Sequence, residues 1–154
     1  MNQAFADLLP TLLPSAIAWA EAQQQQTLAR GQQLDALAQA LARSVGVRHP
    51  ERIRLEVFDV LPVPKDAELR AATVQAGLLG SGTIGLTLGY AVLVRSGWET
   101  DGQLLSHEFR HVQQYEQLGS VRQFLPVYLE QIARFGYDDA PLEIDARDHE
   151  RDHP

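Results

Sequence analysis

The chain has 154 residues and 45% of them are hydrophobic, so it is long enough to bury a core, and we expect a single domain over residues 1–154. Asp and Glu outnumber Lys and Arg by 20 to 13, and the net charge of −7 argues against binding to nucleic acid or to an anionic membrane. The chain has no cysteine, which excludes disulfides and thiolate ligands, so a metal site would have to use His, Asp and Glu.

The N-terminal stretch raises the question of a signal peptide, because Leu8 to Ala20 is mostly apolar. The first basic residue is Arg30, and Pro10 and Pro14 interrupt the apolar stretch, which argues against such a peptide. No stretch approaches the length of a transmembrane helix. We therefore expect a cytoplasmic protein, with secretion as the alternative.

The first 48 residues are predicted to form a helical segment. Pro14-Ser15 indicates a helix start, and the sequence from Ala16 to about Val45 is rich in Ala, Leu and Gln, with apolar residues at helical spacing. Gly31 predicts a bend or a break between two helices.

Residues 50–148 are predicted to form a core of the α+β class with a small, mostly antiparallel sheet. Arg52 to Val60 alternates apolar and charged residues, which is typical of a strand with one face in water. Asp66 is expected to cap a short helix over residues 67–75. After a glycine-rich connector, Thr83 to Arg95 is rich in β-branched and apolar residues and predicts two short strands or one long bulged strand.

The strand predicted at Tyr90 to Arg95 leads into the helix that carries the most informative motif of the chain. We expect this strand to be an open edge that pairs with an extended peptide. The helix itself is predicted from Gly102 to about Leu118, with Thr100 and Gln103 as a capping box at its start and Gly119 as its stop.

Two further helices are predicted at the C-terminal end. Ser120 and Gln123 form a second capping box, for a helix that ends at Gly136. A proline then indicates the start of a last helix over residues 141–148. Residues 149–154 are highly charged, and we expect this tail to fray.

The helix over residues 102–118 contains an HExxH motif, which begins at His107 and ends at His111. Positions four apart lie on one helix face, so His107 and His111 can bind one metal ion. Glu108 lies on the flank of that face, where a carboxylate is poorly placed to be a ligand but well placed to be a general base. The alternative is a pair of histidines hydrogen-bonded within a core.

A catalytic zinc site usually has three protein ligands, so the motif needs one more His, Asp or Glu. Glu143 is the preferred candidate, because it lies in the first turn of the last predicted helix between two apolar residues. Asp145 and His149 on the same helix are alternatives. Glu143 has an alternative explanation as well, as a carboxylate that favours the helix dipole and pairs with Arg147 one turn later.

Several short sequences beside the motif resemble those of one family, the small bacterial zincin-like metallopeptidases. They are Thr-Leu-Gly-Tyr before the helix, His-Val-Gln-Gln-Tyr running out of the motif, and Pro-Leu-Glu-Ile-Asp-Ala downstream, and the resemblance covers roughly residues 50–148. In these proteins a downstream glutamate completes the HExxH site, as in gluzincins. The resemblance implies a zinc ion held by His107, His111 and Glu143, with Glu108 as the base.

The chain departs from the better known gluzincins at one position. In those proteins the glutamate ligand is followed four residues later by an aspartate that accepts a hydrogen bond from a histidine ligand, and this chain has Arg147 there. The acceptor is then expected to be Asp139, Asp145 or a backbone carbonyl.

An intact site implies a hydrolase that acts on a peptide or protein substrate. Zinc would make water more acidic, and Glu108 would take its proton as the water attacks the substrate carbonyl. A donor for the oxyanion is also needed, and the candidates, which the sequence does not rank, are Tyr137, Tyr128, Tyr115 and His149.

Two alternatives differ in class or substrate. The first is a binding or regulatory module that keeps the fold and uses a metal structurally, and a partner protein would complete the shallow cleft expected of so small a chain. Glu108 argues against it, because a structural site has no use for a carboxylate beside its ligands. The second is a metal-dependent hydrolase that acts on a non-peptide amide.

Overall fold

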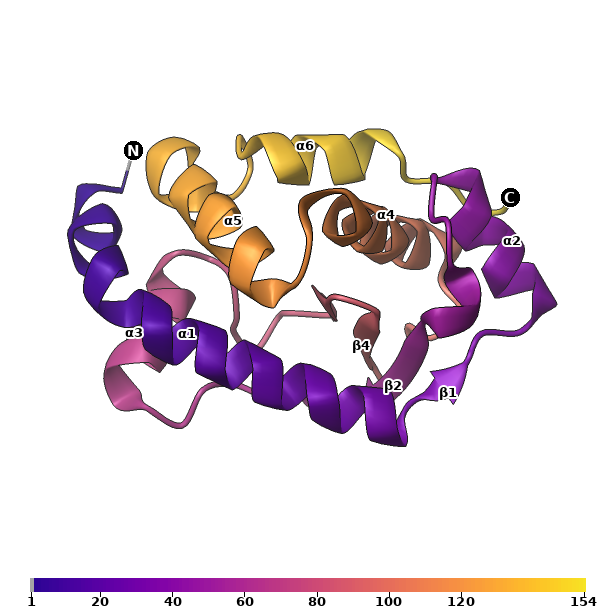
Figure 1. The fold of residues 1–154 in the computed structure, drawn as a ribbon, viewed down its shortest axis with the longest axis horizontal. Helices are drawn as coiled ribbons and strands as arrows, with labels where there is room; N and C mark the ends of the chain where they lie inside the picture. Colours follow the sequence, from indigo (N-terminus) through magenta and orange to yellow (C-terminus); the bar gives the residue numbers. More distant parts are fainter. Residues whose placement is uncertain (1) are drawn as a thin grey trace.

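The computed structural model describes residues 2–154 and has a four-stranded mixed sheet at its centre (Figure 1). The strands lie in the order β1-β2-β4-β3, and they are β1 Gln32–Gln33, β2 Arg54–Phe58, β3 Gly85–Leu88 and β4 Ala91–Arg95. The β1–β2 and β3–β4 pairs are antiparallel, and the β2–β4 pair is parallel. The predicted α+β class is therefore confirmed, with one parallel pair in a sheet expected to be mostly antiparallel.

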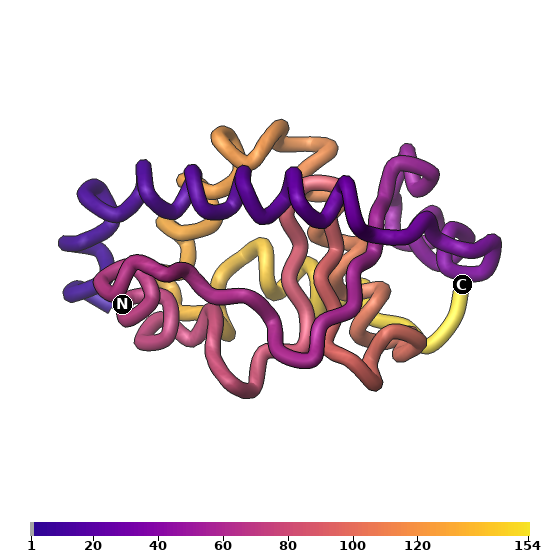
Figure 2. The backbone as a smooth tube through the Cα atoms, turned by 90° about the horizontal axis from the view of Figure 1, so that it is seen from below, coloured from indigo at the N-terminus to yellow at the C-terminus, as the bar shows by residue number. Residues whose placement is uncertain are grey.

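Helices cover both faces of this sheet. Helix α1 crosses the strands along the length of the molecule (Figure 2), and α2 and α4 pack on the other face. The helices are α1 Gln3–Arg30, α2 Ala36–Ser44, the short 3-10 helix η1 Pro50–Arg52, α3 Ala67–Gln75, α4 Gly102–Leu118, α5 Val121–Phe135 and α6 Pro141–Asp148. Within residues 2–154, none of them combines the length and the apolar character needed to cross a membrane.

Strand β4 is buried on both of its faces. Val92 and Val94 pack against α2 and α4, whereas Ala91 and Leu93 pack against α1 and α5. All four residues are 0% exposed. A strand with helices on both faces requires an uninterrupted apolar run, which this sequence supplies.

Helix α1 begins earlier than the sequence predicted. It starts at Gln3, where the side chain of Asn2 accepts a hydrogen bond from the Phe5 amide (3.0 Å), and it continues through Pro10 and Pro14 to Arg30. The prediction of a start at Pro14-Ser15 was wrong because both prolines lie on the exposed side of the helix, where water can bind the carbonyls that they leave free. Burial of the apolar stripe on the opposite side holds the helix together.

The break at Gly31 is confirmed, because α1 ends there and β1 follows. The Gly31 amide donates to the Thr27 carbonyl (2.7 Å). A Cβ atom at position 31 would lie 2.8 Å from that carbonyl oxygen and 3.0 Å from the Arg54 side chain. Only glycine therefore fits where the chain turns from α1 into the sheet.

The two short strands predicted between residues 83 and 95 are confirmed as β3 and β4. The expectation that the second of them is an open edge was wrong. β4 lies between β2 and β3, because β2 returns to pair with it in parallel, and β3 forms that edge of the sheet. The edge strand nevertheless lies beside α4, since the Thr87 hydroxyl contacts the backbone carbonyl of Glu108 (3.1 Å).

Local capping sets most helix boundaries. Asp66 caps α3 as predicted by accepting from the Leu69 amide (2.9 Å), and the Ser120 capping box at the start of α5 is also confirmed. Helix α4 spans the predicted residues and ends at Gly119, but its cap is Asp101, which accepts from the Leu104 amide (2.9 Å). The cap predicted at Thr100 was therefore wrong by one residue.

The C-terminal tail packs against α4, so the expectation that it frays was wrong at its first residues. The Arg151 amide donates to the Ser106 hydroxyl (2.9 Å), and the backbone of Asp152 lies so close to Gly102 that a Cβ atom there would clash with it. The absence of a side chain at Gly102 thus lets the tail cross the first turn of α4. This crossing carries Glu150 toward the HExxH motif.

Candidate metal centre

Two helices bring together the three residues that the sequence singled out as metal ligands. His107 and His111 lie one turn apart on α4, and Glu143 lies in the first turn of α6. The Glu143 carboxylate has one oxygen 3.2 Å from His107 Nε2 and the other 3.0 Å from His111 Nε2. The three ligand atoms lie within 4.8 Å of one another, and Glu143 is only 1% exposed. This group can hold a metal ion.

The second ring nitrogen of each histidine has its own acceptor. His107 Nδ1 lies 2.9 Å from Glu150 Oε1, and His111 Nδ1 lies 2.8 Å from Gln114 Oε1. A histidine that donates from Nδ1 presents the lone pair of its Nε2, which is the atom that a metal ion binds. Both rings are therefore oriented for ligation at Nε2.

The orientation of the Gln114 amide follows from its other contacts. Its Nε2 donates to the Leu142 carbonyl (2.9 Å) and to Asp145 Oδ2 (2.8 Å), which are both acceptors. The amide oxygen is therefore the atom that faces His111 and accepts from its Nδ1. Asp145 in turn pairs with Arg110 at 2.8 and 3.2 Å, so it supports His111 through Gln114.

The arrangement requires positive charge at its centre, because two Nε2 lone pairs would otherwise face a carboxylate. Burial alone would lower the pKa of His107, but its hydrogen bond to Glu143 and the charge of Glu108 outweigh burial and raise that pKa to about 9. The pKa of His111 is raised in the same way, and hydrogen bonds from both histidines hold the pKa of Glu143 well below its usual range despite burial. Two protons or one divalent cation satisfy the cluster, so the residues fit a metal ion.

Glu108 lies beside the three candidate ligands and is not one of the group that could hold the ion. The Thr87 hydroxyl donates to its Oε1 (2.8 Å), and Gly85 leaves room for the rest of the carboxylate. A Cβ atom at position 85 would lie 3.0 Å from both Cδ and Oε2 of Glu108. Strand β3 thus holds this carboxylate beside the histidines, which is where a general base has to be.

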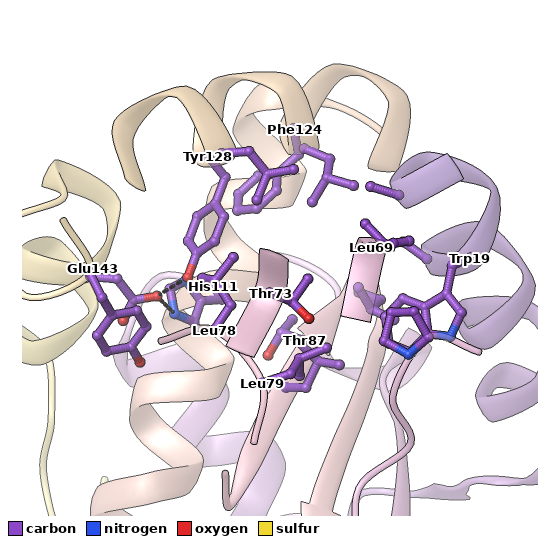
Figure 3. A pocket seen from close by; sticks show the side chains of 18 of the residues that line it. Trp19, Leu69, Thr73, Leu78, Leu79, Thr87, His111, Phe124, Tyr128 and Glu143 are labelled. Carbon is purple, nitrogen blue, oxygen red and sulfur yellow. Dashed lines mark hydrogen bonds and ion pairs between the residues drawn. The ribbon is translucent and has the colours of Figure 1, made fainter. Parts of the chain in front are cut away.

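The aromatic candidates differ in their positions. Tyr128 of α5 donates to Glu143 Oε2 (2.7 Å), so it supports the third ligand (Figure 3). Tyr115 is buried and stacks on Phe124 with ring centroids 3.7 Å apart. Tyr137 is 37% exposed and lines the hollows on both sides of Glu108. Of the three tyrosines, Tyr137 is the best placed to contact a substrate.

The remaining candidates do not join the cluster. His149 Nδ1 lies 2.7 Å from the Asp145 carbonyl oxygen, and Asp139 is exposed and has no hydrogen bond to either histidine ligand within residues 2–154. Arg147 donates to the Asp138 carbonyl, so the proposed pairing of Arg147 with Glu143 is absent from these residues.

Sequence reasoning missed two residues of the candidate site, Gln114 and Glu150, which contact the histidines in place of the expected aspartate or carbonyl acceptors. Gln114 lies three residues after His111, so the helical repeat could have identified it. Glu150 had no comparable pattern, because its position depends on the docking of the tail.

Two hollows meet at Glu108. One is an open cleft of about 670 Å³ between the glycine-rich segment 77–85 and the start of α4, and it reaches His107 and Glu150. The other is a narrower, mostly apolar cavity of about 120 Å³ that reaches His111 and Glu143. The candidate metal centre is therefore accessible from the cleft and open to an apolar interior.

No family model, curated protein or solved structure matches this chain. The interpretation of the site therefore rests on its own geometry.

Proposed function

We propose that the protein is a zinc-dependent peptidase with a zincin-like site, in which His107, His111 and Glu143 are the ligands and Glu108 is the general base. The observation that supports this most strongly is the convergence of two Nε2 atoms on the Glu143 carboxylate at 3.2 and 3.0 Å, with an acceptor on each Nδ1. Two histidines and one glutamate are the protein ligands of several catalytic zinc sites that keep one position open.

Bound zinc would supply a positive charge that acidifies water and polarises a substrate carbonyl. Glu108 accepts the proton of the attacking water and passes it to the leaving amine. The hydrogen bond from Thr87 occupies one oxygen of Glu108, so the other oxygen is the one that carries the proton. Tyr137, which lines the cleft beside Glu108, is the candidate donor for the oxyanion.

The substrate is proposed to enter through the open cleft and to lie along β3. Gly85 and Leu86, the first residues of this edge strand, are only half-buried, and Gly85 contacts the cleft. An extended peptide can add to such an edge through main-chain hydrogen bonds. β3 therefore takes the role that the sequence had suggested for the strand at residues 90–95.

A metal-binding module without catalysis is the second candidate. It accounts for the three ligands equally well, but it gives no reason for the contacts that hold Glu108 beside them. The Thr87 hydrogen bond and the glycine at position 85 favour the peptidase, since both adjust the position of a carboxylate that a structural metal would not need.

The substitution Glu108→Gln tests this choice. It keeps the volume of the side chain and the metal ligands, so the fold and a zinc content of about one per chain are expected to persist. Cleavage of an extended peptide library should fall by about 10² to 10⁴-fold, the usual cost of losing a general base. Equal rates in the two proteins would point to a contaminating protease. No cleavage by a zinc-loaded wild type would favour the binding module.

A further inference from the structure

The C-terminal tail crosses α4 next to His107, and a fully buried hydroxyl holds it there. Figure 1 shows the yellow chain end leaving α6 and passing α4. Ser106, the residue before His107, is 0% exposed, and its Oγ accepts from the Arg151 amide (2.9 Å). The same Oγ can donate to the carbonyl oxygen of Arg151 or of Gln103, each at 3.1 Å. Ser106 therefore fixes the main chain directly after Glu150.

Gly102 leaves the space in which the tail crosses. A Cβ atom at position 102 would lie 2.6 Å from the carbonyl carbon of Asp152 and 3.0 Å from its Cα. These are main-chain atoms, so they can move aside only if the tail moves. Gly102 lies in the first turn of α4, where alanine would suit the helix better than glycine. The tail, rather than α4, requires glycine at this position.

These contacts lead to a candidate metal ligand. Glu150 Oε1 lies 2.9 Å from His107 Nδ1, and the Glu150 side chain is 29% exposed. The residues that follow it, 151–154, are exposed, so burial of their side chains does little to hold the tail. A segment of this kind opens locally unless specific bonds retain it. The acceptor on His107 is therefore only as well fixed as the main chain of Arg151 and Asp152.

We propose that Ser106 and Gly102 are positioning residues of the metal centre, which act on His107 through the tail and so couple docking of the tail to zinc binding. The inference rests on the ligand role of His107 in the proposed function, and it does not require catalysis. An acceptor on a histidine ligand improves metal affinity by about 10 to 100-fold. Coupling between two binding equilibria is reciprocal, so zinc should strengthen docking of the tail by the same factor.

A purely structural role of the two residues makes a different prediction. Ser106 would then stabilise the fold equally with and without zinc, and the tail would not respond to the metal. The contacts favour coupling, because Ser106 directly precedes His107 and Arg151 directly follows Glu150. The two contacts thus share a short piece of main chain on each side, and a tail that leaves Ser106 withdraws the acceptor from His107.

Two substitutions that disturb the tail in opposite ways test the proposal. Ser106→Ala removes the bonds to the tail, whereas Gly102→Ala adds a methyl group that displaces it and removes no bond from α4. Each should raise the Kd for zinc by about tenfold, and neither by more than Glu150→Ala. Ser96→Ala at an exposed position and Gly82→Ala, where a Cβ atom meets nothing within 4 Å, are the matched controls. Competition with a chelator measures Kd, and an unchanged value in both test variants overturns the proposal.

The Glu150→Ala background separates coupling from a general loss of stability. In that background Ser106→Ala and Gly102→Ala should have no further effect on the Kd for zinc, because the acceptor that they position is gone. Effects that add to that of Glu150→Ala would show that the two residues influence zinc by another route, and they would overturn the proposal.

Hydrogen exchange at the Arg151 amide measures the coupling from the other direction. Bound zinc should slow exchange of this amide by about 10 to 100-fold in wild type and leave it unchanged in Glu150→Ala. The Gly119 amide, at the opposite and exposed end of α4, is the control that should not respond to zinc. A structural role of Ser106 alone would not make exchange at Arg151 depend on zinc. Equal exchange rates at Arg151 with and without zinc in wild type overturn the proposal.

Failure of this inference is distinguishable from failure of the proposed function. A wild type that binds no zinc would overturn the proposed function and this inference with it. Zinc binding of equal affinity in wild type, Ser106→Ala and Gly102→Ala would overturn the inference alone. Zinc affinity that depends on Ser106 through Glu150, in a protein that cleaves no peptide, would support the inference and contradict the peptidase.

Discussion

The two histidines of the candidate metal centre are held by different parts of the molecule. His111 is oriented by Gln114, which lies one turn away on the same helix and is 3% exposed. His107 is oriented by Glu150, which comes from the C-terminal tail and has a side chain that is 29% exposed. The centre therefore has an interior side, fixed by packed helices, and a tail side, which depends on a contact near the surface. Local opening of the tail can free the His107 ring while His111 stays in place.

Glu143→Ala should have the largest effect on zinc binding. Glu143 contacts both histidines, so it belongs to the interior side and to the tail side of the centre. We expect loss of the bound zinc, since two remaining ligands hold the ion poorly. Metal analysis after dialysis checks this, with Glu130→Ala on an exposed position of α5 as the matched control. A folded Glu143→Ala protein that still held one zinc per chain would exclude Glu143 as a ligand.

Gln114→Ala and Glu150→Ala should lower zinc affinity to a similar extent but differ in their effect on the free energy of unfolding. Both remove an acceptor from a histidine ligand, and a loss of about 10 to 100-fold in zinc affinity is expected for each. Gln114→Ala breaks a fully buried hydrogen bond, at His111, and also leaves the Leu142 carbonyl without its donor, whereas the bond between His107 and Glu150 is only partly buried. The free energy of unfolding of the metal-free protein should therefore fall by about 1 to 3 kcal/mol in Gln114→Ala and by less in Glu150→Ala. Urea unfolding and zinc titration measure the two quantities.

The variant Glu150→Gln sharpens this comparison, because its amide oxygen can still accept from His107. We expect its zinc affinity to lie between that of wild type and that of Glu150→Ala. Equal destabilisation by Gln114→Ala and Glu150→Ala would show that the tail side is as rigid as the interior side.

Gly85→Ala should displace the Glu108 carboxylate, the proposed base, without changing the residues that hold the zinc. The new Cβ atom would lie 3.0 Å from the Glu108 carboxylate, so the carboxylate has to shift by a few tenths of an ångström. Zinc content should stay near one per chain, and peptide cleavage should fall by on the order of tenfold. Gly82→Ala is the control, because a Cβ atom there meets nothing within 4 Å. Unchanged cleavage in Gly85→Ala would mean that the base does not depend on β3.

The smallest effect is expected for Tyr90→Phe, and it is an effect on the pH dependence of stability. Tyr90 donates to Glu116 (2.8 Å) at the other end of α4, away from the metal centre. Burial and the hydrogen bond to Glu116 raise the pKa of Tyr90 to about 12, against about 10 in the unfolded chain. This contribution to stability is complete below pH 10 and is lost as the pH rises to about 12. Urea midpoints should therefore fall less between pH 10 and 12 in Tyr90→Phe than in wild type. Parallel curves would contradict the raised pKa.

Local patterns predicted the elements that short-range chemistry determines. Helix α4 with its two histidines follows from helical spacing, and the cap at Asp66 and the stop at Gly119 follow from the residues themselves. Glu143 was proposed as the third ligand because it lies among apolar residues of a short helix, and it does lie beside both histidines. The predicted ligand roles are consistent with this placement.

Three features that the sequence did not predict depend on contacts between distant segments of the chain. They are the place of β4 in the sheet, the early start of α1 and the position of Glu150. The parallel pairing of Leu55 with Val92 places β4 inside the sheet, and no local pattern encodes that partner. The prolines of α1 indicated a break, whereas burial of the opposite face decided in favour of a helix. The position of Glu150 depends on the docking of Arg151 on Ser106, 45 residues earlier in the chain.

The order of the strands has a consequence for folding. β3 and β4 are joined by a tight turn at Gly89, which has a φ of +65°, and such a hairpin forms within about 1 to 10 μs. Pairing of β2 with β4 has to close the whole chain between Phe58 and Ala91, so it is slower. Until then the apolar run of β4 exposes an unpaired edge to other chains. Capture of β2, rather than binding of metal, is therefore the step that covers this apolar edge in a newly made chain.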